Sequence, residues 1–138
     1  MSGMTMSNAS EVRSLAGQAF PLAQELLSDI LLQITSLAPF DPNDEKNWNL
    51  QLSALTHDIG QFVEVTTVLS KLMLLEKHSI QPIKDSHIHM LFVLKGIAQA
   101  QQKLDQVILE DLIKHELKDN LTQWKIDLIP NIKKLLNA

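Results

Sequence analysis

Apolar residues recur along most of the chain at the three- and four-residue spacing of amphipathic helices. This spacing predicts a first helix over residues 11–37, with Asn8 as a cap before it and Pro39 soon after it. Pro21 lies inside and predicts a kink, because proline removes a backbone donor and clashes with the preceding turn. The predicted core face consists of Val12, Leu15, Ala19, Leu22, Ala23, Leu26, Leu27, Ile30, Leu31, Ile34 and Leu37.

The second predicted helix covers residues 46–78, with Asp44 as its cap, and is apolar on two sides. Its main face carries Trp48, Leu52, Leu55, Ile59, Phe62, Val63, Leu69 and Met73. A second apolar group, on nearly the opposite side, consists of Val65, Val68, Leu72 and Leu75. Such a helix either lies centrally in its bundle or shares one side with another chain.

Two further helices are predicted in the second half of the chain. The third begins at Asp85 or Ser86 and keeps helical periodicity to Glu116. Its core stripe consists of Met90, Val93, Leu94, Ile97, Ala100, Leu104, Val107, Ile108 and Leu112. Asn120 and Gln123 resemble a capping box for the fourth helix, residues 121–136, whose apolar side is Leu121, Trp124, Leu128, Ile132 and Leu135. Four such helices predict an all-α, four-helix, up-down-up-down antiparallel bundle.

Length and charge narrow the class of protein. With 138 residues and 45% apolar residues, the chain predicts one helical-bundle domain at residues 10–138, after a disordered N-terminal segment or tag remnant at residues 1–9. With 16 acidic and 12 basic residues, the chain has no excess of positive charge with which to bind nucleic-acid phosphates. The pattern predicts no signal peptide and no membrane span, so we expect a cytoplasmic protein that binds neither nucleic acid nor membrane.

The residue types exclude several kinds of chemistry. A chain without Cys has no disulfide, thiolate nucleophile, zinc-thiolate site or iron-sulfur cluster. It also lacks the Glu-x-x-His motif of dimetal bundles, and His87 and His89 are two residues apart, on different faces of a helix. Neither a Gly-x-Ser-x-Gly elbow nor a Gly-rich phosphate loop occurs. We therefore expect no catalytic residue, metal or cofactor, and the sequence favours a protein that is not an enzyme.

One short segment resembles a phosphorelay motif. Residues 52–59, Leu-Ser-Ala-Leu-Thr-His-Asp-Ile, are similar to the phosphoacceptor box of histidine kinase dimerisation helices, in which an exposed His is followed by an acid. The resemblance implies that His57 accepts a phosphoryl group. Helical periodicity places His57 opposite Leu55 and Phe62, where solvent reaches it. The proline that usually follows the box in that family is absent here.

A second segment points to the same class of protein. Residues 94–98, Leu-Lys-Gly-Ile-Ala, are similar to the core of histidine-containing phosphotransfer domains, which are themselves four-helix bundles. In that family the phosphorylated His stands two residues before the Leu, and here that position is Phe92. Periodicity places Phe92 on the polar arc with Lys95 and Gln99, unless it packs beneath the loop at residues 39–42. Gly96 either admits a partner or relieves a tight helix crossing.

Together these patterns predict a non-enzymatic helical interaction protein: an adaptor, chaperone or regulator that acts through exposed apolar helix faces. A protein partner or a second copy of the chain would cover those faces. The predicted interface consists of Val65, Val68, Leu72, Leu75, Phe92, Lys95, Gly96 and Gln99. The alternative is a phosphotransfer-like signalling module, active through His57 or degenerate with Phe92 in the acceptor position. A ligand-binding bundle with an internal pocket is a third possibility.

Overall fold

The computed structural model describes residues 2–136, and the side chains of residues 10–136. Helices α1 (Ser2–Ser36), α2 (Glu45–Leu75) and α3 (Gln81–Gln102) are followed by a continuous helical stretch of α4 (Gln106–Asp111), η2 (Leu112–Leu117), α5 (Lys118–Gln123), η3 (Trp124–Leu128) and α6 (Ile129–Leu136). We call this last stretch, residues 106–136, the C-terminal helix. No strand occurs among the described residues, and the all-α bundle prediction is confirmed.

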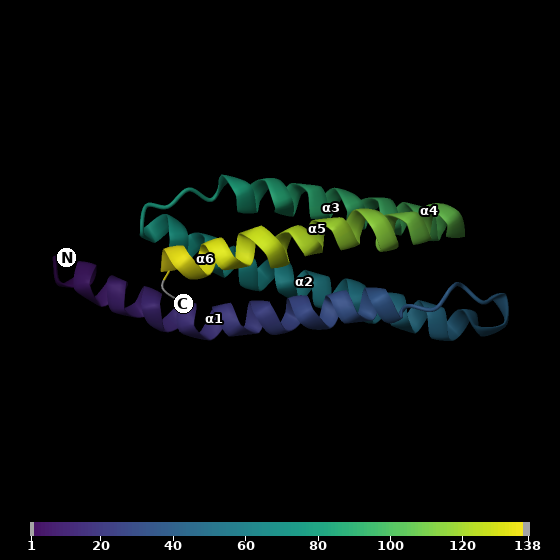
Figure 1. Cartoon of the computed structure of the whole chain (residues 1–138), viewed down its shortest axis with the longest axis horizontal. Coiled ribbons are helices and arrows are strands. Elements are labelled where there is room, and N and C mark those ends of the chain that lie inside the picture. The colour runs from purple at the N-terminus through teal and green to yellow at the C-terminus, as the bar shows by residue number, and fades with distance from the viewer. Residues whose placement is uncertain (1, 137–138) are drawn as a thin grey trace.

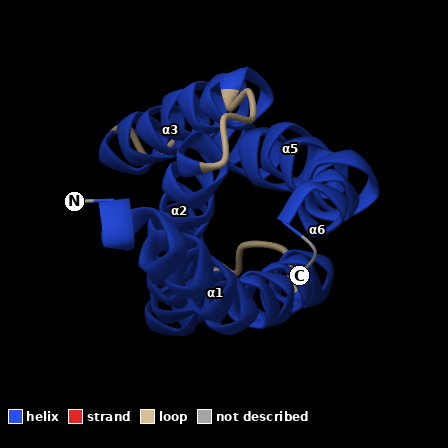
Figure 2. Cartoon of the chain, turned by 90° about the vertical axis from the view of Figure 1, so that its left-hand side faces the viewer, coloured by secondary structure: helices blue, strands red, loops and turns tan. Residues whose placement is uncertain are grey.

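The helices lie side by side along one long axis, and consecutive ones run in opposite directions in Figure 1. Seen from the end in Figure 2, α2 lies between α1 and α3, and the C-terminal helix completes the ring. Helix α2 packs against α1, α3 and α6. Helix α2 therefore has neighbours on more than one side. A central position of this kind is one of the two explanations given above for a helix with two apolar sides.

The core stripe of α1 is narrower than predicted. Its buried residues are Val12, Ala16, Phe20, Ala23, Leu27, Ile30, Ile34 and Leu37. Leu15 and Leu22 were predicted to be core residues, and this is wrong, since they are 46% and 45% exposed. The helix continues through Pro21, whose side chain is exposed, and a kink there stays a prediction. Helix α1 begins at Ser2, so the predicted start at residue 11 and the predicted cap Asn8 are wrong, because Asn8 lies inside the helix. The side chains of residues 1–9 lie outside the described part, and the expectation of a separate N-terminal segment there is not tested.

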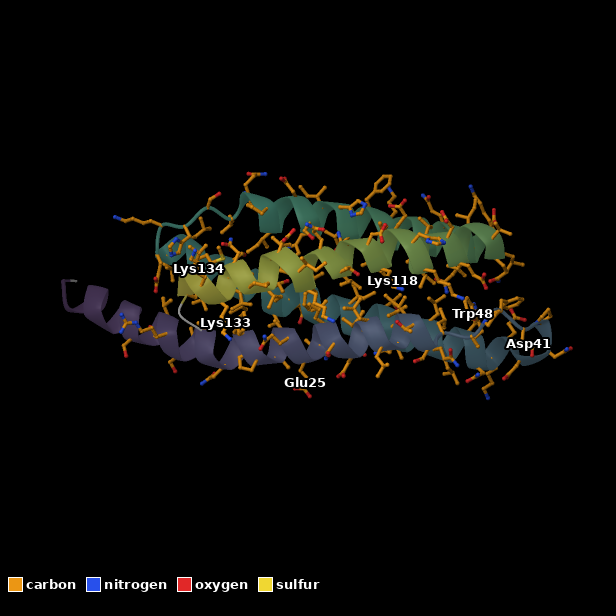
Figure 3. The ribbon with its side chains drawn as sticks, in the orientation of Figure 1. Glu25, Asp41, Trp48, Lys118, Lys133 and Lys134 are labelled. Atoms are coloured by element: carbon orange, nitrogen blue, oxygen red, sulfur yellow. The ribbon has the colours of Figure 1, made fainter. Side chains whose placement is uncertain are left out.

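The end of the bundle near residue 40 is closed by aromatic packing. Phe40 meets Trp48 edge to face, with ring centroids 5.9 Å apart. The backbone N–H of Phe40 donates to Oε1 of Glu110 on α4 at 3.2 Å. Asp41 caps the 3-10 turn η1 (Pro42–Asp44), because its Oδ1 accepts from the N–H of Asn43 at 2.9 Å. Figure 3 shows Trp48 and Asp41 together at this end of the molecule.

The main face of α2 follows the predicted pattern. Trp48, Leu52, Leu55, Ile59, Phe62, Leu69 and Met73 are all buried, while Val63 is half-buried. Asp44 is the N-cap residue, as predicted, although its side chain makes no capping hydrogen bond. The helix ends at Leu75, three residues before the predicted end.

The boundaries predicted for the third and fourth helices are wrong. Helix α3 begins at Gln81, ahead of the predicted caps Asp85 and Ser86, and it ends at Gln102. The chain turns at residues 103–105, where Leu104 has a φ of 54°. Asp105 then caps α4 by accepting from the N–H of Ile108 at 3.1 Å. The turn explains why Leu104, Val107 and Ile108, predicted as core, are exposed.

Helices α2 and α3 end in the same hydrogen-bonded turn. After α2, the N–H of His78 bonds the carbonyl of Met73 and that of Lys77 bonds Leu74, both at 2.9 Å. After α3, the N–H of Asp105 bonds Ala100 at 2.9 Å and that of Leu104 bonds Gln101 at 3.2 Å. Both are Schellman motifs, in which the residue after the cap has positive φ and is usually Gly. Here those residues are Lys77 and Leu104.

The C-terminal helix contains two π-helical segments, η2 and η3. Its first buried apolar residues are spaced by four: Leu109, Ile113, Leu117 and Leu121. In an α-helix each four-residue step overshoots a full turn by about 40°, so the stripe would rotate away from the core. The wider turn of η2 accommodates this spacing. The predicted break before residue 121 is absent, and Asn120, predicted as a cap, is buried within the helix.

None of the described helices is both long enough and apolar enough to cross a membrane.

Candidate functional site

The outer face of α3 exposes three large apolar side chains. Ile88, Leu91 and Phe92 are 67%, 54% and 75% exposed, respectively. They are spaced i, i+3 and i+4, so they lie on one side of the helix. Buried Met90 and Val93 lie on the opposite side and face the bundle. We call Ile88, Leu91 and Phe92 the α3 strip.

Phe92 was predicted from the sequence, whereas Ile88 and Leu91 were missed. Their spacing relative to Phe92 was the signal that could have found them. Lys95 and Gln99 are exposed and continue the face of Phe92 along α3, as predicted. The alternative, in which Phe92 packs beneath the loop at residues 39–42, is not found, because its side chain is exposed.

Gly96 is turned toward the inside of the chain. A Cβ at this position would lie 3.1 Å from Cδ1 of Leu112, on η2. The glycine therefore allows α3 and the C-terminal helix to approach each other, which is the helix-crossing interpretation. It does not lie open to a partner in the way that Phe92 does.

The second apolar face of α2 is divided in the structure. Leu72 is buried inside the chain, Val65 is half-buried, and Val68 and Leu75 are 41% and 64% exposed. Val65 and Val68 line a shallow apolar groove of about 240 Å³ between α2 and α1. The α1 side of this groove carries Leu15, Gln18, Ala19 and Leu22. Leu15, Leu22 and Val68 in this groove are 46%, 45% and 41% exposed, each less than any residue of the α3 strip.

His57 is exposed on α2, as the phosphoacceptor interpretation requires. The adjacent Asp58 accepts a hydrogen bond at 2.6 Å from Nε2 of Gln33 on α1. This hydrogen bond joins the two helices and gives Asp58 a structural partner. Phosphorylation of His57 stays a prediction.

A polar cluster is buried where α2, α3 and the C-terminal helix meet. The hydroxyl of Thr66 donates to the carbonyl of Phe62 at 2.7 Å, so its oxygen accepts from Nε2 of His87, also at 2.7 Å. The His87 ring stacks on Trp124, with centroids 5.6 Å apart. Burial lowers the pKa of His87 below its ordinary value and favours the neutral ring. Thr66 is fully buried, so no substrate reaches its hydroxyl.

A second set of polar contacts extends this cluster toward the surface. Nδ2 of Asn120 donates to the carbonyl of Ser86 at 3.2 Å and to Nδ1 of His89 at 2.9 Å. Because Nδ1 of His89 accepts, Nε2 carries the ring proton, and it lies 3.6 Å from Oε2 of Glu116. These contacts fix α3 against the C-terminal helix. These groups bond to one another across the helix interface, whereas the buried Nε1 of Trp124 beside them has no hydrogen-bond partner.

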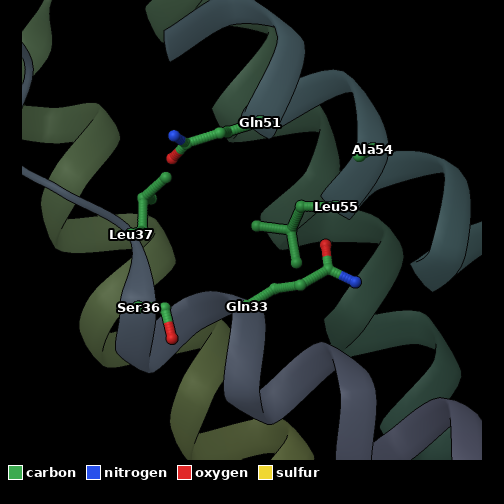
Figure 4. A pocket seen from close by; sticks show the side chains of 6 residues that line it. All are labelled: Gln33, Ser36, Leu37, Gln51, Ala54 and Leu55. Carbon is green, nitrogen blue, oxygen red and sulfur yellow. The ribbon is translucent and has the colours of Figure 1, made fainter. Parts of the chain in front are cut away.

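The structure also has a half-open cavity of about 330 Å³ between the end of α1 and the start of α2 (Figure 4). Its lining consists of Gln33, Ser36, Leu37, Gln51, Ala54 and Leu55. The polar groups among these are two amides and one hydroxyl, with no acid and no base. The lining therefore offers no acid–base pair for hydrolysis.

Within the described part of the chain, no group of three or more His, Asp or Glu side chains could hold a metal ion. Comparison of the chain with protein-family models, with curated proteins and with solved structures found no match.

Proposed function

We propose that this chain is a non-enzymatic interaction protein that binds another protein chain through the α3 strip. The observation that carries the proposal is the exposure of Ile88, Leu91 and Phe92 at i, i+3 and i+4 on the side of α3 that faces away from the core. Helical partners recognise one another through apolar side chains at this spacing.

The energetics favour a covered strip. Burying a large apolar side chain contributes about 1.5 to 3 kcal/mol relative to leaving it in water. Single exposed apolar residues are common and mean little, and Leu32 and Leu50 are of that kind here. Three adjacent ones with an aromatic residue among them form a potential hot spot. Lys95 and Gln99 supply the polar rim of such a site.

A catalytic function has less support in the structure. The half-buried histidine His87 is engaged by Thr66, and the cavity of Figure 4 has no titratable lining residue. The phosphotransfer alternative depends on the exposed His57. It predicts an acid-labile phosphate on His57 after incubation with a phosphodonor, and His57→Gln would abolish it.

The proposal is tested by photo-crosslinking in the cells from which the chain comes. Phe92 is replaced by the photoreactive residue p-benzoylphenylalanine, and the same replacement at Glu25, exposed on α1 and labelled in Figure 3, is the matched control. We expect defined protein adducts from position 92 and none from position 25. Adducts with another protein or with a second copy both support the function. No adducts from position 92, or the same adducts from both positions, would contradict it.

A further inference from the structure

The α3 strip belongs to a longer exposed row along the helix. Asp85, Ile88, Phe92, Lys95 and Gln99 are spaced by three and four residues and are all exposed. This is the spacing of a and d positions in a heptad. With Asp85 as position a, the buried residues Met90, Val93 and Ile97 take positions f, b and f, which point away from the seam and into the bundle. The middle of this row is apolar, at Ile88 and Phe92, and its two ends are polar, with Asp85 on one side and Lys95 and Gln99 on the other.

We propose that the partner of this seam is a second copy of the same chain, with the two α3 helices antiparallel. This inference rests on the proposed function and names the partner. In an antiparallel pair, layers join an a position of one helix to a d position of the other. A twofold axis beside Met90 places Ile88 of each copy against Phe92 of the other, and Leu91 beside the second Leu91.

Charge complementarity selects this partner. The same axis places Asp85 of one copy against Lys95 of the other, twice in the dimer, because both positions are five residues from Met90. It also places Gln81 against Gln99, both nine residues from Met90. The g positions that flank the seam pair with each other, Lys84 with Ala98, so no like charges meet in these pairs. Asp85 accepts from Nε2 of Gln81 at 2.7 Å, and Lys95 makes no ion pair with any residue that the structure describes. A face that complements its own copy is the requirement of a twofold interface.

Charge reversal tests the pairing. Asp85→Lys places Lys against Lys95 of the second copy, and Lys95→Asp places Asp against Asp85, so each variant alone should dimerise at least about tenfold more weakly than the unmodified chain. In an equimolar mixture of the two variants, each of the two pairs again joins one acidic and one basic side chain. The mixture should form a heterodimer at least as well as the unmodified chain forms its homodimer.

Cysteine crosslinking tests the register, and the natural absence of Cys makes the labels unique. Asp85→Cys chains mixed with Lys95→Cys chains should give a disulfide-linked dimer under mild oxidation. Either variant alone should not, because ten residues of helix separate equal positions by about 15 Å in the antiparallel pair. Crosslinking of each variant with itself and not with the other would show a parallel pair and overturn the proposal.

Two further results would overturn it: an unmodified chain that stays monomeric at high concentration, or a dimer that neither charge reversal weakens. Equilibrium unfolding of each variant shows that the fold is intact. The failure of the dimer proposal can be distinguished from the failure of the proposed function. If position 92 photo-crosslinks to another protein while the purified chain stays monomeric, the strip is an interaction surface and the second copy is the wrong partner.

Discussion

Gly96 of α3 faces Leu112 of the C-terminal helix so closely that a Cβ on Gly96 would lie 3.1 Å from Cδ1 of Leu112 and 3.7 Å from Cδ2. This relationship explains a glycine in the middle of a helix, where it costs about 1 kcal/mol relative to Ala. Two roles were considered for Gly96 in the segment Leu94-Lys95-Gly96-Ile97-Ala98: it admits a partner, or it relieves a tight helix crossing. The glycine faces this chain's own C-terminal helix, which supports the helix crossing. The neighbouring Phe92, and not Gly96, presents surface to a partner.

Gly96→Ala tests this packing in a double-mutant cycle with Leu112→Ala. In the natural background, helix propensity and steric crowding oppose each other, so the free energy of unfolding should change by less than about 1 kcal/mol. In the Leu112→Ala background the crowding is gone, and the same change should stabilise the chain by about 1 kcal/mol. Urea unfolding measures both steps. Equal effects in the two backgrounds would show that Gly96 and Leu112 do not interact.

Leu104→Gly should stabilise the chain. Leu104 has a φ of 54° and a side chain that is 73% exposed, so the substitution removes backbone strain and little packing. We expect a gain of about 1 kcal/mol in the free energy of unfolding. Lys103→Gly is the matched control, since Lys103 has a φ of −88° and gains nothing from glycine. If both substitutions destabilise the chain, the turn at residues 103–105 is misplaced.

The missed turn shows what periodicity alone does not determine. Leu104, Val107 and Ile108 continue the apolar spacing of α3, so the sequence was interpreted as one helix from residue 85 to 116. Neither Gly nor Pro marks the break. A weaker signal was present: Asp105, flanked by Leu104 before it and Leu109 four residues after, has the pattern of a helix cap with a hydrophobic staple.

The stability of the chain should fall as the pH falls below the ordinary His pKa of 6.5. Burial lowers the pKa of His87, so the unfolded chain takes up a proton on this residue at higher pH than the folded chain does. His87 therefore makes its full contribution to the free energy of unfolding above pH 6.5. This contribution is lost as the pH falls toward the lower pKa of His87 in the folded chain. His87→Gln should flatten the pH dependence of unfolding relative to the unmodified chain. A pH dependence that His87→Gln leaves unchanged would contradict the assignment to His87.

Asn120→Ala should destabilise the chain by about 1 to 3 kcal/mol, because it removes the two hydrogen bonds of a buried side chain at the helix interface. The side chain of Asn120 bonds Ser86 and His89 across the helix interface. Asp119→Ala, at the exposed neighbouring position, should change stability by less than about 0.5 kcal/mol. Thermal or urea unfolding compares them. Two small and equal effects would indicate that the helix interface at Asn120 is not formed.

The sequence predicted the helical class and the core of α2 better than it predicted surfaces. Trp48, Ile59 and Phe62 lie on one stripe, and this stripe is buried. For α1 the apolar residues cover half the circumference, so the pattern alone did not show that Leu15 and Leu22 lie outside the core. The buried partner of each polar residue, such as Thr66 for His87, depends on helix-to-helix register, which a single sequence does not reveal.

Phe92→Glu, compared with the unmodified chain, isolates the role of the α3 strip. Phe92 is 75% exposed, and Leu32 on α1, which is 65% exposed, provides the matched control Leu32→Glu. Because both positions face solvent, each substitution should change the free energy of unfolding by less than about 0.5 kcal/mol. A loss of several kcal/mol in Phe92→Glu alone would place Phe92 in the core.

Sedimentation velocity of these three proteins tests the account most directly. A single helix face is smaller than the standard interface of about 800 Å² per partner, so the association is weak and the series must extend from about 1 μM to about 1 mM. We predict that the unmodified chain and Leu32→Glu shift from monomer to dimer over this range, while Phe92→Glu stays monomeric throughout. Dimerisation of Phe92→Glu at the same concentrations as the unmodified chain would contradict an interface on α3.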